Sequence, residues 1–117
     1  RPLDRWSAIA DRPLLMQRMQ RALREGIEPH LADARALSRA KADVVHEAEL
    51  LALLGEIVHR EDFEFWDDAT FVQHAQEMGT SASELGRAAG DDQYDAARRA
   101  AGKATNSCAA CHDGSRG

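Results

Sequence analysis

The chain has 117 residues, a length that fits a single domain, and we expect that domain to span residues 1–117. Hydrophobic residues make up 44% and charged residues 30%, with 8 glycines and 3 prolines, which excludes collagen, low-complexity disorder and a disulfide-dense scaffold. The 15 basic and 20 acidic residues leave a net charge of −5. This charge argues against nucleic acid as a partner, because phosphate binding needs a concentrated positive face.

Strong helix formers dominate the chain, and no segment shows the sustained alternation of a β-strand. We predict a first helix from about Pro13 to at least Arg24. Its apolar face carries Met16, Met19, Leu23 and Ile27. The following segment from His30 to Leu37 is again compatible with a helix, so the end of the first helix near Gly26 stays open.

Three further helices are expected. The second covers about Lys41 to His59, with Asp43 as its candidate cap, and the third runs from near Trp66 to Ala89. The sequence Gly90-Asp91-Asp92 is predicted to stop the third helix and to cap the fourth.

The fourth helix is expected to begin near Asp92 and to carry one inward stripe. The stripe consists of Tyr94, Ala97, Ala101, Ala104, Cys108 and Cys111. The three residues of the stripe between Tyr94 and the cysteines are alanines, which fill little space. We therefore expect a large group to fill the space beside Ala97, Ala101 and Ala104.

Both cysteines lie in Cys108-Ala109-Ala110-Cys111-His112, the CxxCH signature of c-type haem attachment. Two thiols about one helical turn apart can each form a thioether with a haem vinyl group, and the adjacent histidine can then bind the iron. Two other interpretations use the same residues. A thioredoxin-like dithiol would require a βαβ context, and a zinc site would require a fourth ligand such as His74 or His59.

The sequence resembles the class II cytochromes c, that is, cytochrome c prime and its low-spin relatives. A CxxCH on the last of four helices defines that family, and Arg116 matches the arginine four residues after the haem histidine. The segment 90–97 resembles the family's turn into the last helix, and the Gly102-Lys103 step fits as well. Near the start, Arg12, Met16 and Met19 have the spacing of the family's first helix.

The resemblance implies an all-α fold, an antiparallel up-down-up-down four-helix bundle with a C-terminal haem attachment site. It implies one covalently attached haem c, held by Cys108 and Cys111, with His112 as the proximal iron ligand. Arg116 would lie near that histidine on the solvent side. Arg12 would pair with a haem propionate, Met16 would project over the distal face, and Met19 would line the pocket.

The sixth coordination position of the iron decides the function. If the Met16 sulfur binds the iron, the site has His/Met ligation suited to electron transfer. If Met16 only packs against the haem, the five-coordinate iron can bind a small gas such as nitric oxide or carbon monoxide. Packing of Met16 and Met19 as ordinary core residues also stays open, as does a site with two histidines, for which His74 lies nearest an apolar face.

We expect no enzyme, because no catalytic constellation accompanies the haem motif. The expected partners are redox proteins with a basic docking face, and a homodimer stays open. No membrane span is expected, since the longest apolar run, Leu50–Leu54, is far shorter than the roughly 20 residues required. The chain starts with Arg1, so we interpret it as a processed product. The resemblance implies a periplasmic protein whose signal peptide has been removed.

Overall fold

The computed structural model describes residues 12–57 and 69–116, and within them the side chains of residues 17–57 and 73–107. Helix α2 (Arg12–Arg21) continues without a break into a π-helical segment, Ala22–Ile27, and a 3₁₀ turn, Glu28–His30. After them come α3 (Ala34–Arg39), α4 (Lys41–Ile57), α5 (Ala69–Gly90) and α6 (Tyr94–Arg116).

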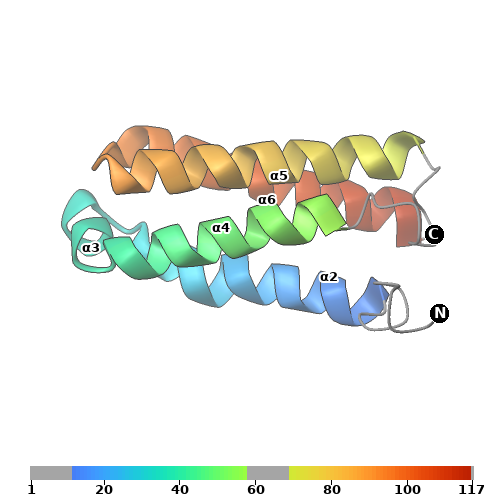
Figure 1. Cartoon of the computed structure of the whole chain (residues 1–117), viewed down its shortest axis with the longest axis horizontal. Coiled ribbons are helices and arrows are strands. Elements are labelled where there is room, and N and C mark those ends of the chain that lie inside the picture. Colours follow the sequence, from blue (N-terminus) through green and yellow to red (C-terminus); the bar gives the residue numbers. More distant parts are fainter. Residues whose placement is uncertain (1–11, 58–68, 117) are drawn as a thin grey trace.

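The four long helices form an antiparallel bundle (Figure 1). The first helical stretch and α5 run in one direction, whereas α4 and α6 run in the other, so the amino end of α2 and the carboxyl end of α6 lie at the same end. Helix α5 packs along both α4 and α6. The predicted all-α, up-down-up-down architecture is confirmed.

The core lies between the helices, where apolar side chains recur every three or four residues. Its largest fully buried side chains are Ile27, Leu37, Val44, Leu51, Met78 and Leu85. They come from the π segment and from α3, α4 and α5, whereas α6 contributes mainly alanines. The chain therefore supplies bulk from three sides and small residues from the fourth.

Helices α3 and α4 begin in different ways, and the start of α4 differs from the prediction. Asp33 caps α3, since its Oδ1 accepts a hydrogen bond from the Ala36 amide at 2.8 Å. The expected cap of the next helix, Asp43, was wrong. Helix α4 already begins at Lys41, and the Val44 amide donates to the carbonyl of Ala40 at 2.9 Å. Asp43 therefore lies within the first turn, where a carboxylate interacts favourably with the helix dipole.

The turn between α5 and α6 lies where Gly90-Asp91-Asp92 predicted it, but the left-handed residue is Asp92, with φ of 59°, and not a glycine. The amide of Asp92 donates to the carbonyl of Ala89 at 3.2 Å, and the amide of Gln93 donates to the carbonyl of Ala88 at 2.8 Å. These two bonds satisfy the last carbonyls of α5 in a Schellman motif. Lys41 donates from Nζ to Asp92 Oδ2 at 3.0 Å, which ties the start of α4 to this turn.

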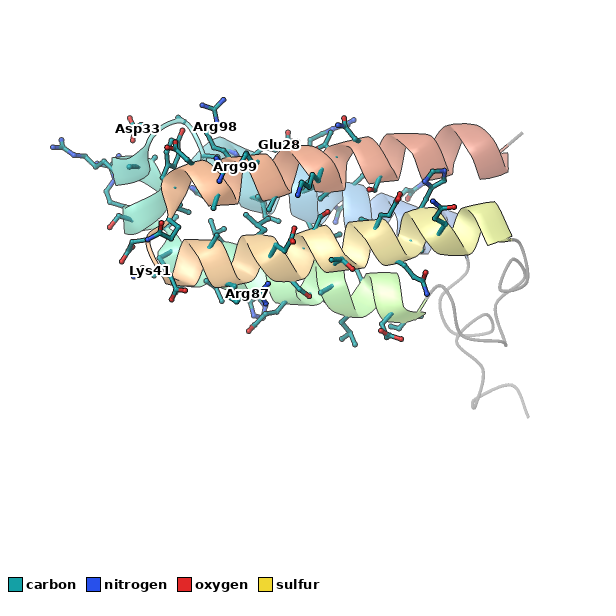
Figure 2. All side chains as sticks on the ribbon, turned by 90° about the horizontal axis from the view of Figure 1, so that it is seen from above. Glu28, Asp33, Lys41, Arg87, Arg98 and Arg99 are labelled. Atoms are coloured by element: carbon teal, nitrogen blue, oxygen red, sulfur yellow. The ribbon has the colours of Figure 1, made fainter. Side chains whose placement is uncertain are left out.

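Several charged side chains lie in the half of the bundle that contains α3 and the turn between α5 and α6. Figure 2 labels Glu28, Asp33, Lys41, Arg87, Arg98 and Arg99 in that half. The guanidinium of Arg98 lies 5.9 Å from the centre of the Tyr94 ring. The carboxyl end of α6, with its CxxCH motif, lies at the opposite end of the bundle.

Helices α4 and α5 approach each other closely at Gly55. A Cβ there would lie 3.0 Å from Met78 Cε, 3.2 Å from the Gly79 Cα and 3.3 Å from the Ala75 carbonyl oxygen. Two of these three atoms belong to the backbone of α5, which cannot turn aside as a side chain can. A glycine is therefore needed at this crossing.

We expect Gly55→Ala to lower the free energy of unfolding by about 1–3 kcal/mol, because the added methyl overpacks the α4–α5 contact. Gly102→Ala is the matched control, since a Cβ at this exposed position on α6 meets no atom within 4 Å. It is expected to raise the free energy of unfolding by about 0.5–1 kcal/mol. Chemical denaturation of both variants measures the two effects, and equal effects would contradict the assigned crossing.

Candidate functional site

Helix α6 carries the CxxCH motif within its regular helical backbone. One line along this helix faces the end of the first helical stretch. Tyr94 donates from its hydroxyl to the Leu31 carbonyl oxygen at 2.7 Å, and Thr105 donates from Oγ1 to Glu28 Oε2 at 3.3 Å. His112 follows Tyr94 by 18 residues, which is five turns at about 3.6 residues per turn. By register, His112 lies on the same line of α6.

The two cysteines lie on the inner face of α6 by the same periodicity. Cys108 follows Ala101 by seven residues, and Cys111 follows Ala104 by seven, so each cysteine shares the position of a buried alanine around the helix. Ala101 is 5% exposed and Ala104 is fully buried. The register of α6 therefore brings both cysteines to the side of the helix that faces the bundle.

The expected explanation of the alanine stripe was wrong. Ala97, Ala101 and Ala104 are already buried by packing between the helices, together with Ala100. Small residues allow α6 to approach α5 closely, and α5 supplies small residues of its own, Ser81, Ala82 and Ala89, at buried positions. A large group is therefore not needed beside these alanines.

The first helix supplies the candidate distal residues. Met19 is 4% exposed and belongs to the hydrophobic core, with Leu23 one turn further along. Met16 lies one turn before Met19 on α2, closer to the end of the bundle that carries CxxCH. The side chains of Arg12, Met16, Cys108, Cys111, His112 and Arg116 lie outside the described ones, so their predicted roles stay predictions.

The ends of α2 and α6 bear on where a c-type haem would be held. Helix α6 meets the first helical stretch at the π segment. From there toward its amino end, α2 diverges from α4 (Figure 1). The two thiols and the imidazole of CxxCH are the donor set of a c-type haem, and they belong to the carboxyl end of α6. A haem held there would lie at the end of the bundle that also contains the amino end of α2.

The other histidines form no second site in the part of the chain that the structure describes. His74, on α5, is 23% exposed, and its Nδ1 lies 3.3 Å from Glu77 Oε1, so one ring nitrogen is engaged by a carboxylate. No group of three histidine, cysteine, aspartate or glutamate side chains able to hold a metal occurs among the described residues. His59, the other candidate fourth zinc ligand, lies outside them.

The dithiol interpretation depends on a βαβ context. Residues 12–57 and 69–116 contain helices, turns and bends and no strand, so nothing in them provides that context. Within these same ranges, none of the helices combines the length and the apolar character needed to cross a membrane.

One feature of the first helical stretch was missed by sequence patterns. The first helix widens into the π segment Ala22–Ile27, and Gly26 within it packs directly against Glu47 of α4. π-Helical turns are frequent at functional sites. The ambiguous region around Gly26 and Pro29 was the available signal, because these residues disturb an otherwise regular helical pattern.

Comparison with known proteins identifies the family. The family model described as Cytochrome C' matches residues 7–116, nearly the whole chain. The comparison with curated proteins gave no match, and neither did the comparison with solved structures. The chain therefore belongs to the cytochrome c′ family, whose members are non-enzymatic haem proteins that carry one covalently attached c-type haem.

Proposed function

We propose that this protein is a periplasmic monohaem electron-transfer protein whose iron is bound by His112 and Met16. The observation that carries the proposal is the placement of these residues. Met16 on α2 and His112 on α6 belong to antiparallel helices whose relevant ends lie together at one end of the bundle. One residue can therefore approach each side of a haem held between the two helices.

The haem supplies one-electron chemistry, and the chain's own residues hold and tune it. Cys108 and Cys111 anchor it through thioethers, and His112 binds the iron from the α6 side. Met16 supplies a thioether sulfur from the α2 side, which favours a higher reduction potential. The same two ligands in both oxidation states keep structural rearrangement on electron transfer small.

Three further residues complete the proposed site. The buried side chain of Met19 adds apolar surface beside Met16 and helps to exclude water. Arg12 pairs with a haem propionate, since a guanidinium and a carboxylate form strong charge-assisted hydrogen bonds. Arg116 follows His112 by four residues and lies beside it at the solvent side.

The net charge of the chain bears on its partners, and the mode of haem attachment bears on its location. The net charge of −5 supports docking to a redox protein with a basic face. Covalent haem attachment of this type takes place outside the bacterial cytoplasm, which supports the periplasm as the location. We propose that residues 1–117 act as one domain with one haem, alone or as a homodimer.

Absorption spectra of the purified holoprotein test the ligation. We expect low-spin bands in both oxidation states, with a weak sulfur-to-iron charge-transfer band in the oxidised form. We also expect nitric oxide and carbon monoxide to bind slowly, because they must displace Met16. A high-spin spectrum that shifts at once on adding either gas would contradict electron transfer through a His/Met site. It would instead establish a five-coordinate, gas-binding haem.

A further inference from the structure

A polar groove of about 510 Å³ lies between α5 and α6. Figure 2 shows these two helices side by side along the bundle. On α5 the groove extends from Gln73 to Glu84, and on α6 it extends from Lys103 to Ser107. Ser107 immediately precedes Cys108, the first cysteine of the CxxCH motif. The groove therefore leads along the outside of the bundle to the proposed haem attachment site.

Oxygen atoms that accept hydrogen bonds dominate the lining of this groove. Every lining residue is polar, and all of them except Lys103 carry such an oxygen. Two are carboxylates, Glu77 and Glu84. The Nδ1 of His74 lies 3.3 Å from Glu77 Oε1, and the Nζ of Lys103 lies 3.9 Å from Glu84 Oε1. Because both contacts use Oε1, the Oε2 of each carboxylate is left to accept from a further donor.

Two buried serines, one from each helix, also line the groove. Ser81 on α5 is 5% exposed, and Ser107 on α6 is 8% exposed. Within the described part of the chain, neither hydroxyl forms a hydrogen bond. A buried hydroxyl without a partner costs free energy, and a donor that enters from outside removes this cost. The two serines therefore point to a hydrogen-bonding ligand independently of the carboxylates.

Resting on the proposed electron transfer, we propose that the α5–α6 groove is the docking surface for a basic redox protein. A lysine or arginine of that partner enters the groove. Its N–H groups donate to Glu77 and Glu84 and to the two serine hydroxyls, since charged donors form strong hydrogen bonds with carboxylates. The net charge of −5 attracts such a partner from a distance. Docking beside Ser107 brings the partner close to the segment of α6 that carries CxxCH, and electron transfer is faster over shorter distances.

The test uses the intact holoprotein and hexaamminechromium(III) as the probe. This ion is a trication that is hard to reduce, and its ammine N–H groups donate hydrogen bonds as a lysine ammonium does. Its unpaired electrons broaden the NMR signals of nearby nuclei. In a titration followed by NMR, we expect the backbone amide signals of both helices to broaden first at Thr80, Ser81 and Ser107. Signals from the outer faces of α2 and α4 should broaden only at higher probe concentration.

Charge variants show whether the groove itself binds the probe. Glu77→Gln/Glu84→Gln is expected to weaken binding roughly tenfold, because each exposed ion pair changes an equilibrium constant by a factor of about two to five. Lys103→Gln removes a competing cation and is expected to strengthen binding by about two- to fivefold. The matched control, Glu25→Gln/Glu49→Gln, removes the same charge from exposed positions outside the groove. At about 0.1 M salt, which screens distant charges, it should change binding by less than about twofold.

Two results would overturn the docking surface: broadening spread evenly over the protein, or equal weakening in the two double variants. Either would mean that water alone fills the groove and that the probe responds only to overall charge. The absorption spectrum of the same holoprotein separates this failure from that of the proposed function. A low-spin holoprotein without broadening at the groove keeps electron transfer and overturns the docking surface. A high-spin, gas-binding holoprotein overturns the proposed function, and with it the part of the groove in electron transfer.

Discussion

Replacing both Cys108 and Cys111 with serine is expected to yield a protein without covalently bound haem. Serine preserves the size and the helical position of each side chain but cannot form the thioether bonds. The intact mass of protein matured in a host that attaches haem should then equal that of the bare polypeptide. The parent chain should instead carry the additional mass of one haem and show its absorption bands.

The same variant is also expected to lose stability. A haem held by α6 would bury apolar surface, which stabilises a fold by roughly 25 cal/mol for each Å² removed from water, and its loss would remove that contribution. The control is Ser107→Ala, at the residue before Cys108 on the same helix, which is 8% exposed. It should keep the haem. A covalently bound haem in the double serine variant would contradict the attachment site, and a colourless parent that binds zinc would support the zinc interpretation.

Met16→Ala is expected to convert the iron from six-coordinate and low-spin to five-coordinate and high-spin. Loss of the thioether ligand should also lower the reduction potential, since methionine ligation raises it. Nitric oxide and carbon monoxide should then bind without displacing a ligand. Optical titration and potentiometry of the parent and variant measure these changes.

Met78→Ala is the matched control, at a buried methionine of α5 that has no place in the proposed site. Met78 is 1% exposed, so its truncation should lower the free energy of unfolding by about 2–5 kcal/mol through a cavity in the core. Its low-spin spectrum should nevertheless persist. If Met16→Ala remains low-spin, His74→Ala is the next variant to measure, because a second histidine ligand would explain that result.

The number and order of the helices followed from sequence because the information is local. Helix formers with apolar residues every three or four positions predicted helices near α2, α4, α5 and α6, and the structure confirms them. The CxxCH motif is equally local, since two thiols and an imidazole within five residues specify haem attachment with no distant partner. The family match agrees with that motif.

Errors arose where distant elements decide the outcome. The buried alanines of α6 were assigned to a haem, whereas close packing against α5 buries them. A stripe of small residues has the same spacing whether it faces a cofactor or another helix. Asp43 was expected to be a cap because aspartate favours that position, but α4 starts two residues earlier.

By itself, the sequence determined the helical class, the order of the helices and the chemistry of the attachment motif, since each depends on neighbouring residues. Only the tertiary structure revealed that α2 continues through a π segment and that Gly26 lies on Glu47, 21 positions further along the chain. Periodicity describes which face of a helix is apolar. It does not describe the angle between two helices, because that angle depends on how side chains from separate elements fit together.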